Sequence, residues 1–103
     1  MAGLKWTLKA VGDLELIYDY ISADSPWYAR IQVERLYKSV EHLRTFPEAG
    51  RHLPEFPQRP HREVINGAYR CIYRYEEQSD TVFVITVVHG SRLLSEQLLD
   101  PPI

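Results

Sequence analysis

The stretch TVFVITVVH, Thr81 to His89, is almost continuously apolar and rich in β-branched residues. Such a run is typical of a strand that is buried on both faces, or nearly so. Two further predicted strands, Glu63–Ile65 and Tyr69–Tyr75, flank Asn66 and Gly67, the dipeptide most typical of a two-residue β-hairpin turn. The second half of the chain is therefore predicted to form a small, mainly antiparallel sheet.

Two amphipathic helices are predicted before this sheet. A short strand, Leu4–Thr7, precedes the first helix, and Thr7 could cap that helix. The apolar residues of the first helix recur at i, i+3, i+4 and i+7, while Asp13 falls largely outside that face. These apolar residues are Leu14, Ile17, Tyr18 and Ile21. Ser25 and Pro26 are typical of a helix start, and the second helix then carries a regular apolar seam. The seam comprises Ala29, Val33, Leu36, Val40 and Leu43.

The predicted order of elements is β-α-α-β-β-β, an α+β fold in which a helical hairpin packs on the sheet. With 103 residues, 45% of them hydrophobic and 25% charged, residues 1–103 fit a single globular domain. The segment PEAGRHLPEFPQRPH between the helices and the sheet is predicted to be an irregular loop. The tail after Arg92 is predicted either to form a short helix or to lie loose.

Several functional classes are disfavoured by composition. A formal net charge of −2 argues against a chain held to nucleic acid mainly through phosphate contacts, so direct sequence-specific DNA binding is not expected. Cys71 is the only cysteine, and neither a signal peptide nor a membrane span is recognisable, which indicates a cytoplasmic protein. The histidines His42, His52 and His61 lack metal-ligand spacing, and neither a metal nor a cofactor is expected.

A basic patch is the main candidate site on the predicted sheet. Arg70, Ile72 and Arg74 alternate with tyrosines and Cys71, so if the tyrosine face packs on the helices, the arginine face looks outward. That face could be a plain solvated surface or a functional one. His89 ends the buried strand, where a partner-binding, catalytic or purely structural role is open. The candidate target-binding residues are Arg62, Arg70, Arg74, His89 and Arg92.

A series of short motifs identifies a family resemblance. WTLKAVGDLELIYDYI, LRTFPEAGR, REV, YRCIYRY and VVHGSR follow one another between Trp6 and Arg92. In this order and spacing they resemble the ParE toxins of the RelE/ParE superfamily, the toxins of type II toxin–antitoxin modules. The resemblance implies the β-α-α-β-β-β order that the residue patterns also predict.

The resemblance implies two alternative activities. RelE-type toxins are ribosome-dependent mRNA endoribonucleases; here Arg70 and Arg92 would bind phosphate, and His89 or Glu55 would move protons. For cleavage, RelE-type toxins also use lysines in the loop before the hairpin and a tyrosine in the C-terminal helix. Here the loop RHLPEFPQRPH has no lysine and the tail has no tyrosine, so these two groups of residues are missing. ParE-type toxins instead bind and block DNA gyrase without catalysis, and this is the favoured prediction. A binding module without toxic activity is a third alternative.

The family also implies a ParD-like antitoxin whose flexible segment docks on the helical hairpin in a toxin–antitoxin hetero-oligomer. Large apolar residues that lie off the main seam of the two helices would line its groove, although they could equally cover the edges of the core. The candidate antitoxin-binding residues are Leu16, Tyr20, Tyr28, Ile31 and Tyr37.

Overall fold

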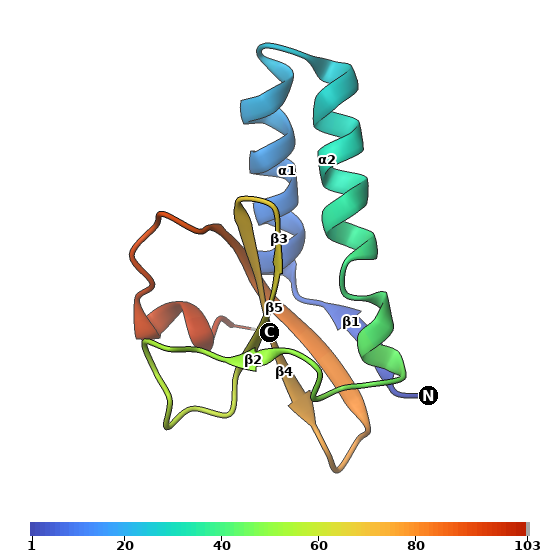
Figure 1. Cartoon of the computed structure of the whole chain (residues 1–103), viewed down its shortest axis with the longest axis vertical. Coiled ribbons are helices and arrows are strands. Elements are labelled where there is room, and N and C mark those ends of the chain that lie inside the picture. The colour runs from blue at the N-terminus through green and yellow to red at the C-terminus, as the bar shows by residue number, and fades with distance from the viewer. Residues whose placement is uncertain (103) are drawn as a thin grey trace.

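The computed structural model describes residues 1–102, which form two α-helices and a five-stranded sheet (Figure 1). The sheet order is β1-β5-β4-β3-β2; β1 runs parallel to β5, and the other neighbours are antiparallel. The predicted α+β fold is thus confirmed, with a short strand β2 added inside the predicted loop. The elements are β1 (Gly3–Trp6), α1 (Leu8–Ser22), α2 (Pro26–Lys38), η1 (Glu41–Arg44), β2 (Arg51–His52), β3 (Arg62–Asn66), β4 (Tyr69–Glu76), β5 (Thr81–His89) and η2 (Glu96–Leu99).

The helical hairpin projects beyond the sheet along the long axis of the molecule, and the α1–α2 connection lies at its far end (Figure 1). Both predicted helix starts are confirmed, because Thr7 Oγ1 accepts a hydrogen bond from the Ala10 N–H and Ser25 Oγ accepts one from the Tyr28 N–H, each at 3.1 Å. None of the described helices has the length and apolar character that spanning a bilayer requires.

The predicted seam of the second helix is buried, but the helix itself is shorter than the seam. α2 ends at Lys38, and Val40 and Leu43 reach the core from the following turn and η1. The Ser39 N–H donates to the carbonyls of Arg35 and Leu36, and the Ser39 hydroxyl donates to the Leu36 carbonyl at 2.7 Å. These bonds cap α2 and allow the chain to change direction.

The main core lies between the hairpin and one face of the sheet. Cys71 and Tyr73 are fully buried in it, so the predicted packing of the tyrosine face on the helices is confirmed. The Tyr73 hydroxyl accepts the Gly50 N–H at 2.9 Å. A Cβ at Gly50 would lie only 2.6 Å from both the Tyr73 ring and the Glu63 carbonyl oxygen, so this position requires glycine.

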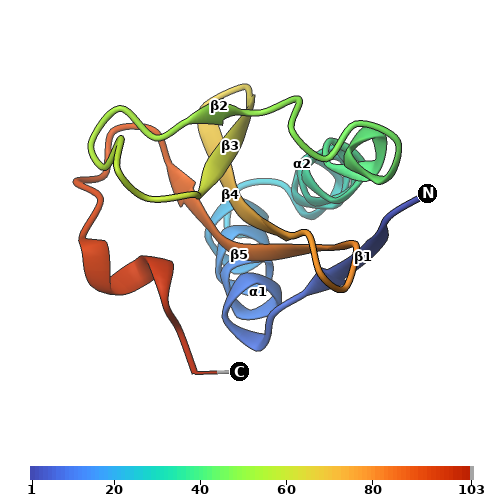
Figure 2. The ribbon, with the colours of Figure 1, turned by 90° about the horizontal axis from the view of Figure 1, so that it is seen from below.

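The opposite face of the sheet is also covered, and the predicted outward-looking arginine face is wrong at its centre. Ile72 is fully buried and Arg70 is 8% exposed. A second core forms there, contributed largely by the 53–56 loop and the tail, and η2 lies on the other side of the strands from α2 (Figure 2). Its members are Leu53, Phe56, Ile72, Val88, Leu94, Leu98 and Leu99. Val88 lies in this second core while Val84 lies in the first, which confirms that β5 is buried on both faces.

Helix α1 covers the part of β5 that extends beyond β1. Pairing between β1 and β5 ends at Val84, and the Val87 N–H beyond it is bonded at 3.0 Å by the buried carboxylate of Asp13. The same carboxylate accepts the Thr86 hydroxyl and the Lys9 ammonium, each at 2.5 Å. Asp13, which the sequence places off the apolar face, therefore joins α1 to the sheet.

Candidate functional site

A surface hollow of about 500 Å³ lies where α1 passes the ends of β4 and β5. Leu16 and Tyr20, two of the predicted antitoxin-binding residues, line it and are 68% and 81% exposed. His89, predicted as a target-binding residue, lines the same hollow, so the structure joins members of two separately predicted sets. Three further residues line the hollow and were not predicted from the sequence as binding residues: Ile17, Tyr69 and Ser91.

Tyr69 and His89 meet because they are partners in register across β4 and β5. Their rings lie edge to face with centroids 5.4 Å apart. His89 Nδ1 accepts the Ser91 N–H at 3.1 Å and lies 2.7 Å from the Ser91 hydroxyl. In the neutral ring the proton is therefore on Nε2. Pairing the two predicted strands across the turn that contains Asp80 could have indicated from the sequence that Tyr69 lies near His89. The exact pairing of Tyr69 with His89 depends on the position of the β-bulge, which the sequence does not show.

The remaining predicted antitoxin-binding residues are distributed over other parts of the hairpin. Tyr28 lines a neighbouring hollow that Tyr69 also lines. Tyr37 stacks on Trp6 of β1 with ring centroids 5.5 Å apart, and Ile31 is half-buried. Leu16, Tyr20 and Tyr28 thus gather around Tyr69 instead of lining one groove between the helices.

Arg70 lies in an ion-pair cluster under the 53–60 loop. Glu55 binds both terminal nitrogens of its guanidinium, at 2.6 and 2.8 Å, and Glu63 Oε1 accepts from Nε at 2.5 Å. The other oxygen of the buried Glu63 accepts from Arg51 Nε at 2.6 Å. Glu55, the loop residue that the nuclease alternative would use for proton transfer, is therefore a partner of Arg70, and the guanidinium is bonded on two sides by carboxylates.

The same cluster of charges lowers the ability of Glu55 to accept a proton. Hydrogen bonds from Arg70 lower the pKa of Glu55 to about 2, and the two carboxylates raise the pKa of Arg70. A carboxylate with so low a pKa is a weak proton acceptor near neutral pH. Glu55 is thus poorly suited to the proton-transfer role that the nuclease alternative would give it.

The other predicted target-binding arginines do not form one cationic surface with Arg70. Arg62 Nη1 donates to the carbonyls of Glu48 and Gly50, at 3.1 and 2.9 Å, and so holds the chain before β2. Arg74 is half-exposed and lies 3.8 Å from Glu76, and Arg92 is exposed on the turn after β5. Their roles in target binding remain predictions, with Arg74 and Arg92 the accessible pair.

Metal and thiol chemistry find no support in the part of the chain that is described. Across residues 1–102 no three His, Cys, Asp or Glu side chains are grouped so that they could hold a metal ion. Burial raises the pKa of the Cys71 thiol to about 11, and its sulfur lies 3.7 Å from the Ser39 hydroxyl. The thiol is therefore protonated and inaccessible at neutral pH.

A buried histidine ties the C-terminal segment to the sheet. His61 is 1% exposed, and its Nε2 donates to the Leu99 carbonyl at 2.9 Å. Its Nδ1 has no hydrogen-bond partner among residues 1–102. Burial is the main reason that the pKa of His61 lies below its usual value of 6.5.

This histidine should make the fold sensitive to acid. Because the folded-state pKa is depressed, the neutral ring contributes its full stability above pH 6.5, and the contribution is lost as the pH falls towards the folded-state pKa. Urea unfolding of the wild type should therefore show a larger loss of stability between about pH 7.5 and 5 than that of His61→Gln. The exposed His52 supplies the matched control, His52→Gln, which should follow the wild type. Equal pH dependence of the wild type and His61→Gln would contradict the assignment.

Comparisons with known proteins agree with this fold. The family model of the ParE toxin of type II toxin–antitoxin system, parDE, matches residues 4–94. Toxin RelE2 from Caulobacter vibrioides is 33% identical over 94 residues, which cover 90% of this chain and 100% of that protein. The structure of a chromosomal ParDE system from P. aeruginosa has a TM-score of 0.70 at 25% identity, over 86% of this chain and 96% of the other.

A second solved structure is similar in fold alone. The E. coli RelBE toxin–antitoxin complex has a TM-score of 0.61 at 20% identity, over 89% of this chain and 100% of the matched chain. The matched residues of the family model include both helices and all the strands from Leu4 onward, together with the hollow around Tyr69 and the Arg70 cluster. The chain belongs to the ParE/RelE family of type II toxin–antitoxin toxins.

Proposed function

We propose that this toxin acts by binding a protein target, DNA gyrase, without cleaving mRNA, and that a ParD-like antitoxin neutralises it. The observation that carries the proposal is the pairing of Arg70 with both Glu55 and Glu63. A nuclease arginine must present its guanidinium to the scissile phosphate. Here that guanidinium is already bonded by two carboxylates, and Arg70 as a residue is 8% exposed.

Several residues around Arg70 add to this argument. Glu63 is buried and fixed between Arg51 and Arg70, so even if the loop moved Glu55 away, a carboxylate would remain on the guanidinium. Glu55 itself is a weak base. The loop contains no lysine and the tail no tyrosine, so these two elements of a RelE-type centre are missing from the segments that would carry them.

Antitoxin binding is supported by the apolar surface of the projecting hairpin. Leu16, Tyr20 and Tyr28 are exposed around Tyr69, and an apolar patch of this kind on a small domain typically binds a partner. The P. aeruginosa relative is described as a ParDE toxin–antitoxin system, and the E. coli structure as a toxin–antitoxin complex. The candidate antitoxin-binding residues remain Leu16, Tyr20, Tyr28, Ile31 and Tyr37.

Two assays on one preparation test the proposed target. The purified toxin is expected to inhibit DNA supercoiling by purified gyrase, and to produce no new mRNA ends by primer extension in a translating extract. Arg74→Ala with Arg92→Ala should raise the toxin concentration for half-inhibition at least about tenfold, since two accessible charges of the candidate target surface are lost. The half-exposed Arg44, which pairs with Glu41 on η1, supplies the control Arg44→Ala, which should leave inhibition unchanged.

Two outcomes would overturn the proposal. The first is normal supercoiling in the presence of a clear excess of folded toxin. The second is the appearance of new mRNA ends that depend on the toxin, which would instead support the RelE-like alternative.

A further inference from the structure

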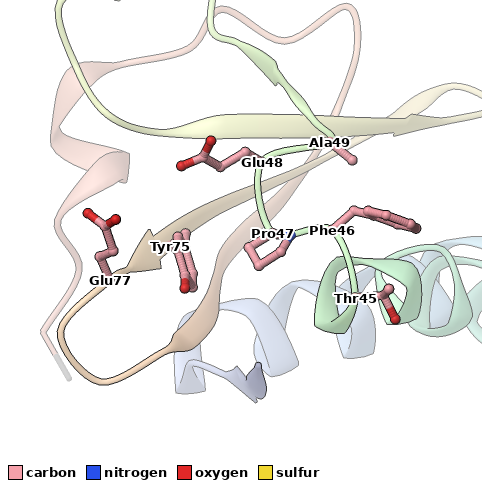
Figure 3. A pocket seen from close by; sticks show the side chains of 7 residues that line it. All are labelled: Thr45, Phe46, Pro47, Glu48, Ala49, Tyr75 and Glu77. Atoms are coloured by element: carbon pink, nitrogen blue, oxygen red, sulfur yellow. The ribbon is translucent and has the colours of Figure 1, made fainter. Parts of the chain in front are cut away.

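A further hollow, of about 570 Å³, lies between the segment after η1 and the end of β4 (Figure 3). Phe46, Pro47 and Tyr75 line it, and in Figure 3 Pro47 lies between Tyr75 and the Phe46 ring, which extends away from Tyr75. The Glu48 and Glu77 side chains extend on the same side of the hollow as the Tyr75 ring (Figure 3). None of these residues belongs to the candidate antitoxin or target sets, so the hollow is a separate surface.

The hollow combines apolar surface with unpaired negative charge. Phe46 is 63% exposed although it is a large apolar side chain. Neither Glu48 nor Glu77 forms an ion pair with any residue between 1 and 102, and both are exposed. The Tyr75 hydroxyl donates to Asp80 at 2.7 Å, which adds a third carboxylate close to the ring.

Charge complementarity defines what such a hollow can bind. The carboxylates attract a cation, the Tyr75 ring offers a π face on which that cation can stack, and Phe46 and Pro47 accept an apolar neighbour. Arginine suits these groups better than lysine, because its planar guanidinium can stack and at the same time donate to two carboxylates.

We propose that the Phe46–Glu48–Tyr75–Glu77 hollow is a docking site for a peptide segment of a partner protein that carries an arginine next to an apolar residue. The guanidinium lies between Glu48 and Glu77 and stacks on Tyr75. The apolar neighbour packs on Phe46 and Pro47. The inference goes beyond the proposed function, because the site uses other residues and does not depend on whether gyrase is the target.

An NMR titration of the full-length ¹⁵N-labelled protein tests the site. The probe is the peptide acetyl-Leu-Arg-Leu-amide, and the control probe is acetyl-Leu-Glu-Leu-amide. The arginine peptide is expected to shift the amide resonances of residues 45–49 and 75–77, saturably and more weakly at high salt. The glutamate peptide is expected to leave them unchanged.

Two variants separate this site from general attraction to an acidic protein. Glu48→Gln with Glu77→Gln is expected to weaken binding at least about tenfold, since both charge-assisted contacts are lost. Glu34→Gln removes an exposed carboxylate from α2 and should bind as the wild type does. Glu48 and Glu77 are both at the surface, so their replacement should leave the fold intact. An NMR spectrum of the double variant that differs from the wild type only near residues 48 and 77 would show that it is folded. Shifts centred elsewhere, equal binding of the two peptides, or unchanged affinity in the double variant would overturn the proposal.

Discussion

Substitution of Arg70 by alanine is expected to lower the free energy of unfolding by about 3 kcal/mol. Glu63 is 0% exposed in its side chain and would lose the partner on one oxygen, keeping only the Nε of the half-exposed Arg51. An uncompensated buried carboxylate is among the most destabilising single changes. Urea or guanidinium unfolding, followed by circular dichroism, measures the loss.

The matched control is the next arginine on the same face of β4. Arg74 is 40% exposed in its side chain and lies 3.8 Å from Glu76, so Arg74→Ala should cost less than about 1 kcal/mol. Arg70→Met combined with Glu63→Leu should recover part of the stability lost in Arg70→Ala, because apolar replacement of a buried pair removes the unpaired charge. Equal effects of Arg70→Ala and Arg74→Ala would show that the buried cluster does not contribute as described.

This prediction affects how toxicity should be tested. Loss of toxicity in Arg70→Ala would not by itself indicate a contact with the target, since the variant is expected to be less stable. The accessible Arg74 and Arg92 are better probes of the target surface. For the same reason, the role of the loop in toxicity is better tested with the conservative variant Glu55→Gln than with Arg70→Ala. Glu55→Gln weakens only the contact of Arg70 with its half-exposed partner and leaves the buried Glu63 in place.

The Asp13→Ala variant is expected to lose about 3 kcal/mol of stability. The Asp13 carboxylate accepts the Val87 N–H and the Thr86 hydroxyl, both buried, and its removal leaves these donors without a partner. Asp13 also pairs with Lys9 one turn earlier, at 2.5 Å. Chemical denaturation gives the magnitude, and amide hydrogen exchange at Val87 should accelerate because α1 no longer closes the edge of β5.

Two variants bracket this result. Asp19→Ala removes an exposed aspartate from the same helix and should change stability by less than about 0.5 kcal/mol. Asp13→Asn retains an oxygen that can accept the Val87 N–H, so it should be less destabilising than alanine. If the alanine and Asp19 variants behaved alike, Asp13 would not have the joining role assigned to it.

Local patterns in the sequence were sufficient for most of the architecture. The Thr7 and Ser25 caps and the burial of the predicted apolar seam each depend on residues a few positions apart, and these predictions are confirmed. The predicted hairpin also forms, but Asn66 pairs with Tyr69, so its two loop residues are Gly67 and Ala68 instead of Asn66 and Gly67. The bulge between the Ile72 and Tyr73 pairs lies on the β5 side, so the predicted alternation of faces along β4 is preserved.

The candidate site was only partly accessible to such reasoning. Leu16, Tyr20 and His89 were selected from sequence, but their convergence on Tyr69 depends on the register between β4 and β5 and on the path of α1 across the strand ends. Tyr37 was grouped with them by residue type, yet it lies against Trp6, because its position on α2 directs it to the β1 side.

The sequence by itself determined the order of elements, both helix starts, the hairpin and the double burial of β5, because periodicity and capping are local properties of the chain. Only the tertiary structure decided that the Arg70 side chain is buried and paired with two carboxylates. Its partners Glu55 and Glu63 lie 15 and 7 residues away. The segments that cover its face of the sheet, which contribute Leu53 and Leu99, have no periodic pattern. An alternating strand shows which residues share a face, but whether irregular chain covers that face depends on long-range contacts that no local pattern records.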